Sequence, residues 1–376
     1  MRLLYFSRDY TTHDHRFLSA LAKTEHQVYY LRLERRGHQL EERSLPPEIE
    51  IVPWCGGQAP ARWQDGFRLS KALKKVLGRV KPEVVLAGPI QRSAFLVALA
   101  GFRPLVSMSW GYDLLQDAER NSAWRWATRF TLKRSAAMVG DCTTIRKLAM
   151  AYGMPDERIV TFPWGIDLEH FTPAGHSHPP EVSSAAGETP FTLLSTRSWE
   201  PVYGVETIAR AFTKAASQCP ELRLAMLGNG SQASLLRRIL SSGGLANAGI
   251  FPRVLFPGQI SYADLPRYYR SSDLYISASY SDGTSISLLE AMACSCPVLV
   301  SDIPGNREWV NHGENGWLFP EGDEKALAQA IVQAVAQRER LPEMGRAARR
   351  TAELRADWRL NFPQLERAFE IAKTSA

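Results

Sequence analysis

Short apolar runs alternate with longer stretches of helical periodicity along most of this 376-residue chain. Strands that alternate with helices pair in parallel, and the helices then cover both faces of the sheet. The alternation therefore predicts an α/β fold built on parallel sheets. Strands are expected at residues 2–6, 28–33, 84–86, 105–108, 138–139, 159–162, 191–195, 222–227, 254–256, 274–277 and 298–300, with helices, among others, at 15–23, 66–79, 124–134, 204–218 and 358–374.

The alternation stops between residues 173 and 190, where Pro, Gly, Ser and His replace any regular period. This composition favours a linker, and a chain of this length has room for two domains with separate cores. We therefore expect a Rossmann-like domain at 1–170, a linker at 171–190 and a second Rossmann-like domain at 191–355. Because parallel sheets bind ligands beyond the carboxyl ends of their strands, two such domains predict parallel sheets that face each other across a cleft.

Composition is that of a soluble globular protein, with 45% hydrophobic and 22% charged residues. No stretch approaches the roughly 20 apolar residues that span a bilayer, and the N-terminal sequence becomes polar too early for a signal peptide. The five cysteines form no CxxC pair and no Cys/His cluster with metal-ligand spacing. Free thiols in a reducing compartment are the expected state, and a zinc site is disfavoured. These features predict a cytoplasmic protein.

Positive charge is concentrated in the first half of the chain. Residues 1–170 contain 25 Lys and Arg against 18 Asp and Glu, a net charge of +7, whereas residues 171–376 contain 20 against 21, a net charge of −1. A basic half of this kind favours an anionic partner or surface. Residues 121–137 mix Trp and Phe with Arg and Lys, which suits a helix at an anionic membrane surface and predicts a peripheral protein at the inner face of the membrane. A packed helix whose arginines extend to solvent is the alternative.

Two carboxylates, Asp282 and Glu290, flank a loop of small residues and the start of a helix, with seven residues between them. Small residues let the backbone approach a ligand, while the free amide hydrogens and the dipole of a helix N-terminus favour a phosphate. A carboxylate one or two turns into the helix is then placed to bind ribose hydroxyls. The block predicts a nucleotide site in which Glu290 holds the ribose.

The same block resembles family 4 of the glycosyltransferases, whose hallmark is two carboxylates, usually both Glu, with seven residues between them. The resemblance continues in Ala291-Met292-Ala293, Pro297-Val298, Gly305-Asn306-Arg307-Glu308 and Asn315-Gly316. It implies the GT-B architecture, a retaining mechanism and a terminal helix, residues 356–376, that crosses back to the N-terminal domain. The implied activity is transfer of a hexose from a nucleoside-diphosphate sugar, with UDP favoured over GDP-mannose, to a hydroxyl of a glycan or lipid-linked acceptor. Polysaccharide or surface-glycan assembly is the expected setting.

The resemblance also assigns donor contacts. Arg197 matches an Arg that meets the donor pyrophosphate, Asp282 is expected to orient the donor sugar, and Tyr203 stands where the family usually has a Lys. A Tyr offers one hydrogen bond and no charge, which leaves Arg197 as the main cation. Other donor contacts are expected from a glycine turn, from the segment that meets the base and from the phosphate loop: Gly228, Asn229, Gly230, Gln259, Ile260, Gly283, Thr284, Ser285, Ile286 and Ser287. The alternatives are a surface Arg, a plain turn and ordinary packing.

Acceptor contacts are expected from two loops of the first domain. The loop after the first strand offers Asp9, His13, Asp14 and His15 where relatives usually carry Gly-Gly. The alternatives are a metal site, over which acceptor recognition is favoured, and an inert polar loop in which Asp14 lies near a helix N-cap.

A second motif resembles the family's His-Gly-x-Asp, with Trp110, Gly111 and Asp113. Trp110 suits stacking on a sugar face, and Asp113 is the candidate to help deprotonate the acceptor. A helix-capping Asp is the alternative.

Other functions are weighed against the same residues. No Asp-x-Asp motif is present, so no divalent metal or other cofactor is expected beside the donor sugar. A GT-B nucleotide-sugar epimerase and a non-catalytic nucleotide-sugar scaffold remain open, because Tyr203 and Trp110 depart from the family pattern. A nicotinamide dehydrogenase is disfavoured because no GxGxxG follows the first strand, and no nucleic-acid-binding module is recognised.

Overall fold

The computed structural model describes residues 1–35, 41, 43–174, 190–242 and 253–375. The described chain forms two compact units: Met1–Pro163 with the chain from Phe362 onward, and Trp164–Asn361. Most of the expected linker at 171–190 lies outside the described residues.

The N-terminal unit contains a seven-stranded, fully parallel sheet in the order β3-β2-β1-β4-β5-β6-β7. Every residue of the central strands β4, β5 and β6 is buried, as expected where helices cover both faces of a parallel sheet. The strands are β1 (Arg2–Ser7), β2 (Gln27–Arg32), β3 (Glu50–Ile51), β4 (Val84–Ala87), β5 (Leu105–Met108), β6 (Ala137–Gly140) and β7 (Ile159–Thr161). The α-helices of this unit are α1 (Thr12–Leu21), α2 (Gly66–Val80), α3 (Phe95–Ala100), α4 (Tyr112–Leu115), α5 (Ser122–Arg134), α6 (Thr143–Ala151) and α15 (Gln364–Thr374) among the described residues.

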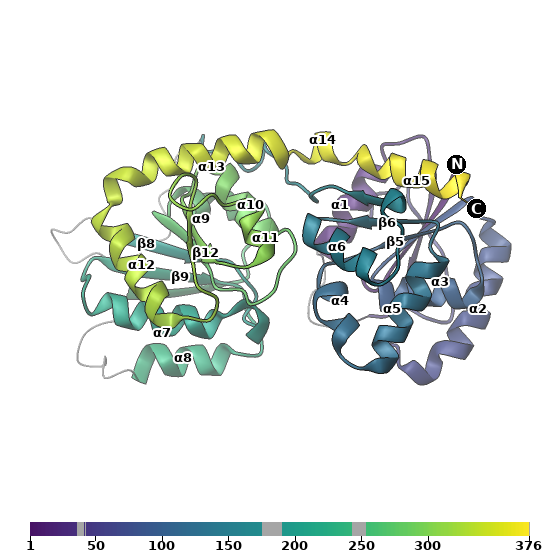
Figure 1. Ribbon diagram of the computed structural model, residues 1–376, viewed down its shortest axis with the longest axis horizontal. Helices are drawn as coiled ribbons and strands as arrows, with labels where there is room; N and C mark the ends of the chain where they lie inside the picture. The colour runs from purple at the N-terminus through teal and green to yellow at the C-terminus, as the bar shows by residue number, and fades with distance from the viewer. Residues whose placement is uncertain (36–40, 42, 175–189, 243–252, 376) are drawn as a thin grey trace. The chain divides into compact units, whose positions relative to one another are not determined.

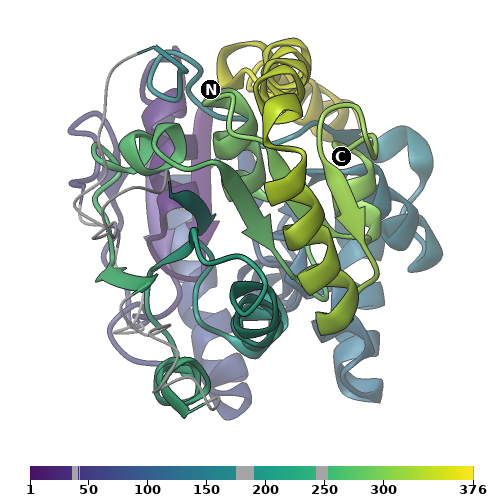
Figure 2. The ribbon, with the colours of Figure 1, turned by 90° about the vertical axis from the view of Figure 1, so that its left-hand side faces the viewer.

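The C-terminal unit contains a six-stranded parallel sheet in the order β10-β9-β8-β11-β12-β13. Helices α7, α8 and α12 bury one face and helices α9, α10 and α13 the other, so two apolar layers enclose the sheet (Figures 1 and 2). The strands are β8 (Phe191–Ser195), β9 (Leu222–Leu227), β10 (Val254–Gly258), β11 (Leu274–Ser277), β12 (Val298–Ser301) and β13 (Trp317–Phe319). The helices are α7 (Val205–Ala216), α8 (Ala233–Ser242), α9 (Leu265–Arg270), α10 (Ile286–Ala293), α11 (Pro304–Arg307), α12 (Glu324–Ala336), α13 (Leu341–Arg355) and α14 (Trp358–Asn361).

Both sheets reverse their strand order beside the first strand of the unit, between β1 and β4 and between β8 and β11. At such a switch point the chain leaves neighbouring strands toward opposite faces, which opens a crevice at their carboxyl ends. The residues that follow β8 and β11 are therefore the ones that a ligand can reach in the C-terminal unit.

The predicted α/β class and its parallel sheets are confirmed. Strands β3 and β13 were not predicted, because edge strands of two and three residues are too short to show a periodic pattern. The single helix expected at 358–374 is wrong. α14 ends at Asn361 and α15 starts after Pro363, because proline lacks an amide hydrogen and disfavours a helical residue before it.

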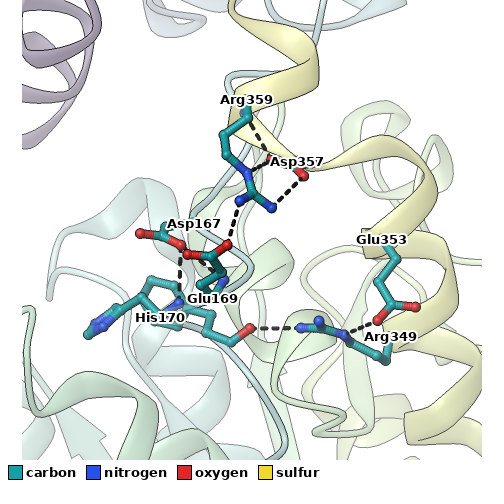
Figure 3. A network of polar contacts seen from close by, with 8 residues as sticks. Asp167, Glu169, His170, Arg349, Glu353, Asp357 and Arg359 are labelled. Atoms are coloured by element: carbon teal, nitrogen blue, oxygen red, sulfur yellow. Dashed lines mark hydrogen bonds and ion pairs between the residues drawn. The ribbon is translucent and has the colours of Figure 1, made fainter. Parts of the chain in front are cut away.

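The segment that leads into the C-terminal unit is held by the end of the same unit (Figure 3). The Ile166 amide donates to the carbonyl oxygen of Ala356 at 2.7 Å, and the Trp358 amide donates to that of Ile166 at 3.0 Å. Arg359 forms ion pairs with Glu169 and Asp357.

Arg349 extends this contact to the helix that carries Glu290. Its Nη1 donates to the carbonyl oxygens of Phe171 and Ala293, at 2.8 and 2.7 Å. Because Ala293 is the last residue of α10, one guanidinium joins the entering segment to that helix.

A close backbone contact fixes the turn between β8 and α7. Gly204 has φ +60, and a Cβ at this residue would lie 2.0 Å from the carbonyl oxygen of Ala278, just beyond β11. Only glycine permits both the left-handed backbone and this approach. The turn after β8 and the loop after β11 therefore pack directly on one another.

We expect Gly204→Ala to lower the free energy of unfolding by about 3 kcal/mol, because it adds left-handed strain and a clash with backbone. Gly313→Ala is the matched control, since Gly313 has φ +86 and no heavy atom within 4 Å of the added Cβ. It should lose only about 1 kcal/mol. Urea unfolding followed by tryptophan fluorescence measures both, and equal losses would refute the close approach.

Candidate nucleotide-sugar site

Arg197 lies two residues beyond the end of β8, at the switch point of the C-terminal sheet. Its Nη2 lies 2.7 Å from Oδ2 of Asp282, and its Nη1 donates to the hydroxyls of Ser285 and Ser287 at 3.0 and 3.2 Å. These partners follow β11, the sheet neighbour of β8. The adjacency of the two strands thus brings together residues that are some 85 positions apart in the chain.

The cluster is largely removed from solvent, with the Arg197 side chain 12% and the Asp282 side chain 19% exposed. Burial raises the pKa of Asp282 above its ordinary value, and the Arg197 guanidinium limits that rise. Burial disfavours the charged form of Arg197, but the Asp282 carboxylate outweighs this and keeps the pKa of Arg197 raised. The Nε atom of Arg197 is buried without a hydrogen-bond partner among the described residues. A ligand oxygen would satisfy it, since buried donors are rarely left unpaired.

Tyr203 lies against the face of the same guanidinium, with 4.0 Å between the Arg197 Cζ and the ring centroid. The aromatic ring of Tyr203 is therefore the part of this side chain that contacts the cation.

Glu290 is buried in the second turn of α10 and accepts a hydrogen bond from the Tyr269 hydroxyl at 2.9 Å. The same hydroxyl lies 3.0 Å from Thr196 Oγ1, beside Arg197. Burial and the Glu290 carboxylate raise the pKa of Tyr269 well above its ordinary value, so the hydroxyl keeps its proton and donates it. Tyr269 therefore connects the second acid to the loop that carries the cation.

Tyr269 and Thr196 escaped the sequence analysis, and so did Tyr275, whose hydroxyl lies 2.8 Å from Ser287 Oγ. Tyr275 stands in an apolar strand pattern that predicts only a core position, and the neighbours of Tyr269 in the sequence give no sign of a site role. Their buried hydroxyls become recognisable once the acids and serines that they contact are placed in space.

The loop that is expected to hold a phosphate leads into the start of α10. Ser285 is its N-cap, and its Oγ accepts from the Leu288 amide at 3.4 Å as well as from Arg197. Thr284, Ser285 and Ser287 are buried, and Ile286 opens the helix. The backbone beside Gly283 is approached closely by Gly305, where a Cβ would lie 2.2 Å from the Gly283 carbonyl oxygen.

The glycine turn after β9 packs on the loop after β8. The Trp199 amide donates to the carbonyl oxygen of Asn229 at 3.0 Å, and a Cβ at Gly230 would lie 2.5 Å from the Trp199 carbonyl oxygen. The Gly228 amide donates to the carbonyl oxygen of Gly258 at the end of β10. The turn therefore lies at the same sheet edge as Arg197.

The residues expected to meet the base follow directly on β10. Gln259 is exposed, whereas Ile260 is partly buried against the core under α9 and α10. Both lie one strand beyond the glycine turn, again at the carboxyl edge of the sheet.

In the N-terminal unit, the carboxylates expected to bind acceptor are engaged by the protein. Asp14 accepts from the Thr11 amide at 2.9 Å and from the Tyr5 hydroxyl at 3.0 Å, and it closes a capping box at the start of α1. Burial raises the pKa of Asp14 to about 6. Asp9 is buried and accepts from the Tyr10 amide, with Arg32 3.9 Å away. These placements favour the structural alternative for Asp14.

The two expected histidines differ in their surroundings. His15 Nδ1 lies 2.7 Å from the Tyr10 hydroxyl, and burial lowers the pKa of His15. The ring of His13 lies 5.4 Å from that of Trp110, between centroids. The loop after β1 and the loop after β5 are thereby brought together at His13 and Trp110.

Asp113 is fully buried at the start of α4, after Gly111, whose φ is +86. Its oxygens accept from the Ile90 amide at 3.0 Å, from the Ser109 hydroxyl at 2.6 Å and from the Leu114 amide at 3.0 Å. Burial raises the pKa of Asp113 to about 6. A carboxylate placed in this way supports the helix and the neighbouring loop, and it favours the capping alternative over a role as base.

The described residues lack two further kinds of feature. No group of three or more His, Cys, Asp or Glu side chains in this part of the chain is arranged to hold a metal ion. None of its helices is long and apolar enough to cross a membrane.

Curated proteins with related sequences carry glycosyltransferase names. The GtfA subunit of a UDP-N-acetylglucosamine–peptide N-acetylglucosaminyltransferase from Streptococcus pneumoniae is 28% identical over 186 residues, 49% of this chain and 33% of that protein. A phosphatidyl-myo-inositol mannosyltransferase from Mycobacterium leprae is 29% identical over 217 residues, 57% of this chain and 54% of that protein. The matched regions thus span about a third to a half of these relatives.

A similar fold occurs in the solved structure of HepE from Anabaena in complex with UDP-glucose. The TM-score is 0.74 with 18% sequence identity, over 98% of this chain and 99% of that one.

Models of two sequence families match the two units in turn. The family described as Glycosyltransferase Family 4 matches residues 11–170, and the family described as Glycosyl transferases group 1 matches residues 181–351. Between them they account for nearly all of both parallel sheets. With this coverage and these relatives, the chain belongs to the group 1 glycosyltransferases and has the GT-B fold.

Proposed function

We propose that this chain is a retaining glycosyltransferase that moves a hexose from a nucleoside-diphosphate sugar to a hydroxyl of a glycan or lipid-linked acceptor. The observation that carries the proposal is the placement of Arg197 at the switch point of the C-terminal sheet. Its guanidinium faces the hydroxyls of Ser285 and Ser287 at a helix start, and its buried Nε has no partner among the described residues. This arrangement suits the diphosphate of a donor.

Stabilisation of the leaving group follows from the same contacts. Negative charge accumulates on the diphosphate as the bond from the sugar to its phosphate breaks, and donors already fixed at that place stabilise the charge without reorganisation. Arg197 and the loop of residues 283–287 supply those donors, with the distal phosphate nearest to them. Glu290 binds the ribose, while Asp282 orients the sugar.

The acceptor proton goes to the departing phosphate. In the proposed step the acceptor oxygen loses its proton to a phosphate oxygen and bonds to the anomeric carbon on the face that the phosphate leaves. The Asp113 carboxylate accepts three hydrogen bonds within a fully buried site, which makes it unsuited to act as this base. Trp110 and His13 offer an aromatic surface for an acceptor sugar.

We propose a UDP-sugar rather than GDP-mannose as the donor; the relatives include proteins named for each of these donors, and the choice between them is tested below. The pneumococcal relative is named for UDP-N-acetylglucosamine, and HepE was crystallised with UDP-glucose. The mycobacterial relative is named a phosphatidyl-myo-inositol mannosyltransferase, which supports a lipid-linked acceptor and a place in polysaccharide or surface-glycan assembly. We propose that no divalent metal or other cofactor takes part.

The first test measures donor binding and then the hydrolysis and transfer reactions. Thermal unfolding with UDP-glucose, UDP-N-acetylglucosamine, GDP-mannose and ADP-glucose identifies the donor, because a ligand of the native state raises the melting temperature. Donor hydrolysis and transfer are then measured with EDTA present. We expect Glu290→Gln to lower kcat/KM about 10- to 100-fold and Arg197→Ala about 100- to 1,000-fold, through loss of charge-assisted contacts. Arg210→Ala, on the exposed surface of α7, is the control and should leave activity unchanged.

Each contrary result has a definite reading. Binding without turnover would identify a non-catalytic scaffold, and an epimerised nucleotide sugar formed without acceptor would identify an epimerase. Absence of binding to every nucleotide sugar would reject the proposal, while activity lost in EDTA and restored by a divalent ion would reject metal independence.

Asp282 provides a second prediction, because its charge opposes that of an incoming diphosphate. Asp282→Asn should lower the melting temperature of the empty protein, since Arg197 loses its counterion. It should bind UDP about fivefold more tightly, because a repulsion of about 1 kcal/mol between partly screened charges disappears.

Calorimetric titration with UDP and thermal unfolding measure the two effects. Glu206→Gln is the control, since Glu206 forms an ion pair of the same 2.7 Å length with Arg210 on the surface of α7. Weaker UDP binding by Asp282→Asn would mean that the carboxylate aligns Arg197 for the ligand rather than competing with it.

We also propose that the protein is cytoplasmic and that α5 contacts the anionic inner face of the membrane. Trp124, Ala127 and Leu132 turn one side of α5 into the protein, whereas Trp126 is 55% exposed and stacks on Phe130. Exposed basic residues surround it: Arg125, Arg129, Lys133 and Arg134. Leu99, on the adjacent α3, is also exposed. An aromatic centre with a basic rim is typical of helices that lie at anionic lipid.

Sedimentation with phosphatidylcholine vesicles, with and without phosphatidylglycerol, tests this contact. We expect binding only to the anionic vesicles, and its loss in the double variant Arg129→Glu, Lys133→Glu, because each basic residue near such a surface contributes about 1 kcal/mol. The matched control reverses Arg210 and Lys214, which are exposed on α7 of the other unit. Equal loss in both double variants, or none in either, would contradict a role for α5.

A further inference from the structure

Tyr203 is the only described aromatic residue within cation–π distance of the Arg197 guanidinium, and the backbone around it is firmly held. It ends a single turn, Pro201–Tyr203, in which the Tyr203 amide donates to the carbonyl oxygen of Glu200 at 3.0 Å. The next residue, Gly204, has the close approach to Ala278 described above. The ring itself packs against the core formed with α7. Tyr203 is therefore a rigid support.

The ring and the polar partners use different parts of the cation. A guanidinium carries five N–H donors in its plane and two flat faces. Asp282, Ser285 and Ser287 approach the Nη atoms, while the Arg197 Cζ lies over the Tyr203 ring, 4.0 Å from its centroid. Face contact orients the cation without occupying a donor. The Nε–H is buried and lacks a partner among the described residues, so the contact with Tyr203 does not use it.

The Tyr203 hydroxyl makes no hydrogen bond to the described residues, so the ring is the part of the side chain that contacts Arg197. An ammonium at this position would add charge but would offer Arg197 no flat surface. The guanidinium would then be held by Asp282 and two hydroxyls alone, and the long arginine side chain would have more orientations open to it.

We infer that Tyr203 is a positioning residue, which acts on the donor diphosphate through the face of Arg197 and not through its own hydroxyl. The inference rests on the proposed function, in which Arg197 holds the distal phosphate. Phenylalanine then substitutes for Tyr203, whereas a residue of similar bulk without an aromatic face does not.

The test measures UDP and UMP binding by calorimetry in wild type, Tyr203→Phe and Tyr203→Leu. Tyr203→Phe should bind UDP within twofold of wild type. Tyr203→Leu should bind UDP about 5- to 30-fold more weakly, the range expected for a partly desolvated cation–π contact. UMP, which lacks the distal phosphate, should bind all three proteins within twofold, and this agreement also reports that Tyr203→Leu keeps its folded site.

A double-mutant cycle tests whether the effect of Tyr203 on UDP binding depends on Arg197. Because Tyr203 is argued to act through Arg197, adding Tyr203→Leu to Arg197→Ala should weaken UDP binding no further. An equal loss in both backgrounds would overturn the inference, as would equal losses for UDP and UMP or an equal loss in Tyr203→Phe. If wild type binds another base better, the diphosphate and monophosphate of that base replace UDP and UMP. Failure of wild type to bind any nucleoside diphosphate rejects the proposed function as well, whereas a failure confined to the variants rejects only the role of Tyr203.

Discussion

The paired charges of Arg197 and Asp282 are the interaction on which the C-terminal site depends. Each charge would be unfavourable alone at this depth, since a buried ion without a counterion loses its hydration with nothing in exchange. With Arg197 Nη2 2.7 Å from Asp282 Oδ2, the carboxylate stabilises the cation at the sheet edge in the absence of a ligand. Without a ligand, the charges of Arg197 and Asp282 sum to zero. A bound diphosphate therefore gives the site a net negative charge. The affinity for the donor then depends on how much more strongly the guanidinium interacts with the diphosphate than with the Asp282 carboxylate.

Backbone contacts make this pairing possible. The loops after β8, β9 and β11 approach one another more closely than side chains permit, and the contact points are Gly204, Gly230 and Gly305. Parallel strands place these loops at the same edge of the sheet, but this alone does not make the loops pack against one another. Missing Cβ atoms let three loops and α11 pack closely on one another. The arrangement of the loops around Arg197 thus depends on close backbone packing at these glycines.

The sequence predicted most strands and helices, but it did not predict which side chains from different elements contact one another. The alternation of apolar runs predicted the parallel sheets, and the loop of small residues between Asp282 and Glu290 predicted a helix start between two acids, because both signals are local. The Arg197–Asp282 pair is not local, since it requires β8 to lie beside β11. Tyr269 was missed for a related reason: its sequence neighbours give no sign of a polar role, and only the fold brings its hydroxyl to Glu290.

The acids of the N-terminal unit show how burial separates chemically similar residues. Asp14 and Asp113 each follow a strand end, where a ligand-binding carboxylate is expected, yet both serve the starts of helices and have pKa values raised by burial to about 6. A base must reach the proton that it removes, and a carboxylate that already accepts several protein hydrogen bonds is poorly placed to do so. In the proposed reaction this leaves the departing phosphate as the proton acceptor. The charge that Arg197 stabilises is then also the charge that deprotonates the acceptor, which sets a limit on how tightly the guanidinium may hold it: a cation that neutralised the phosphate completely would weaken the base that the transfer needs.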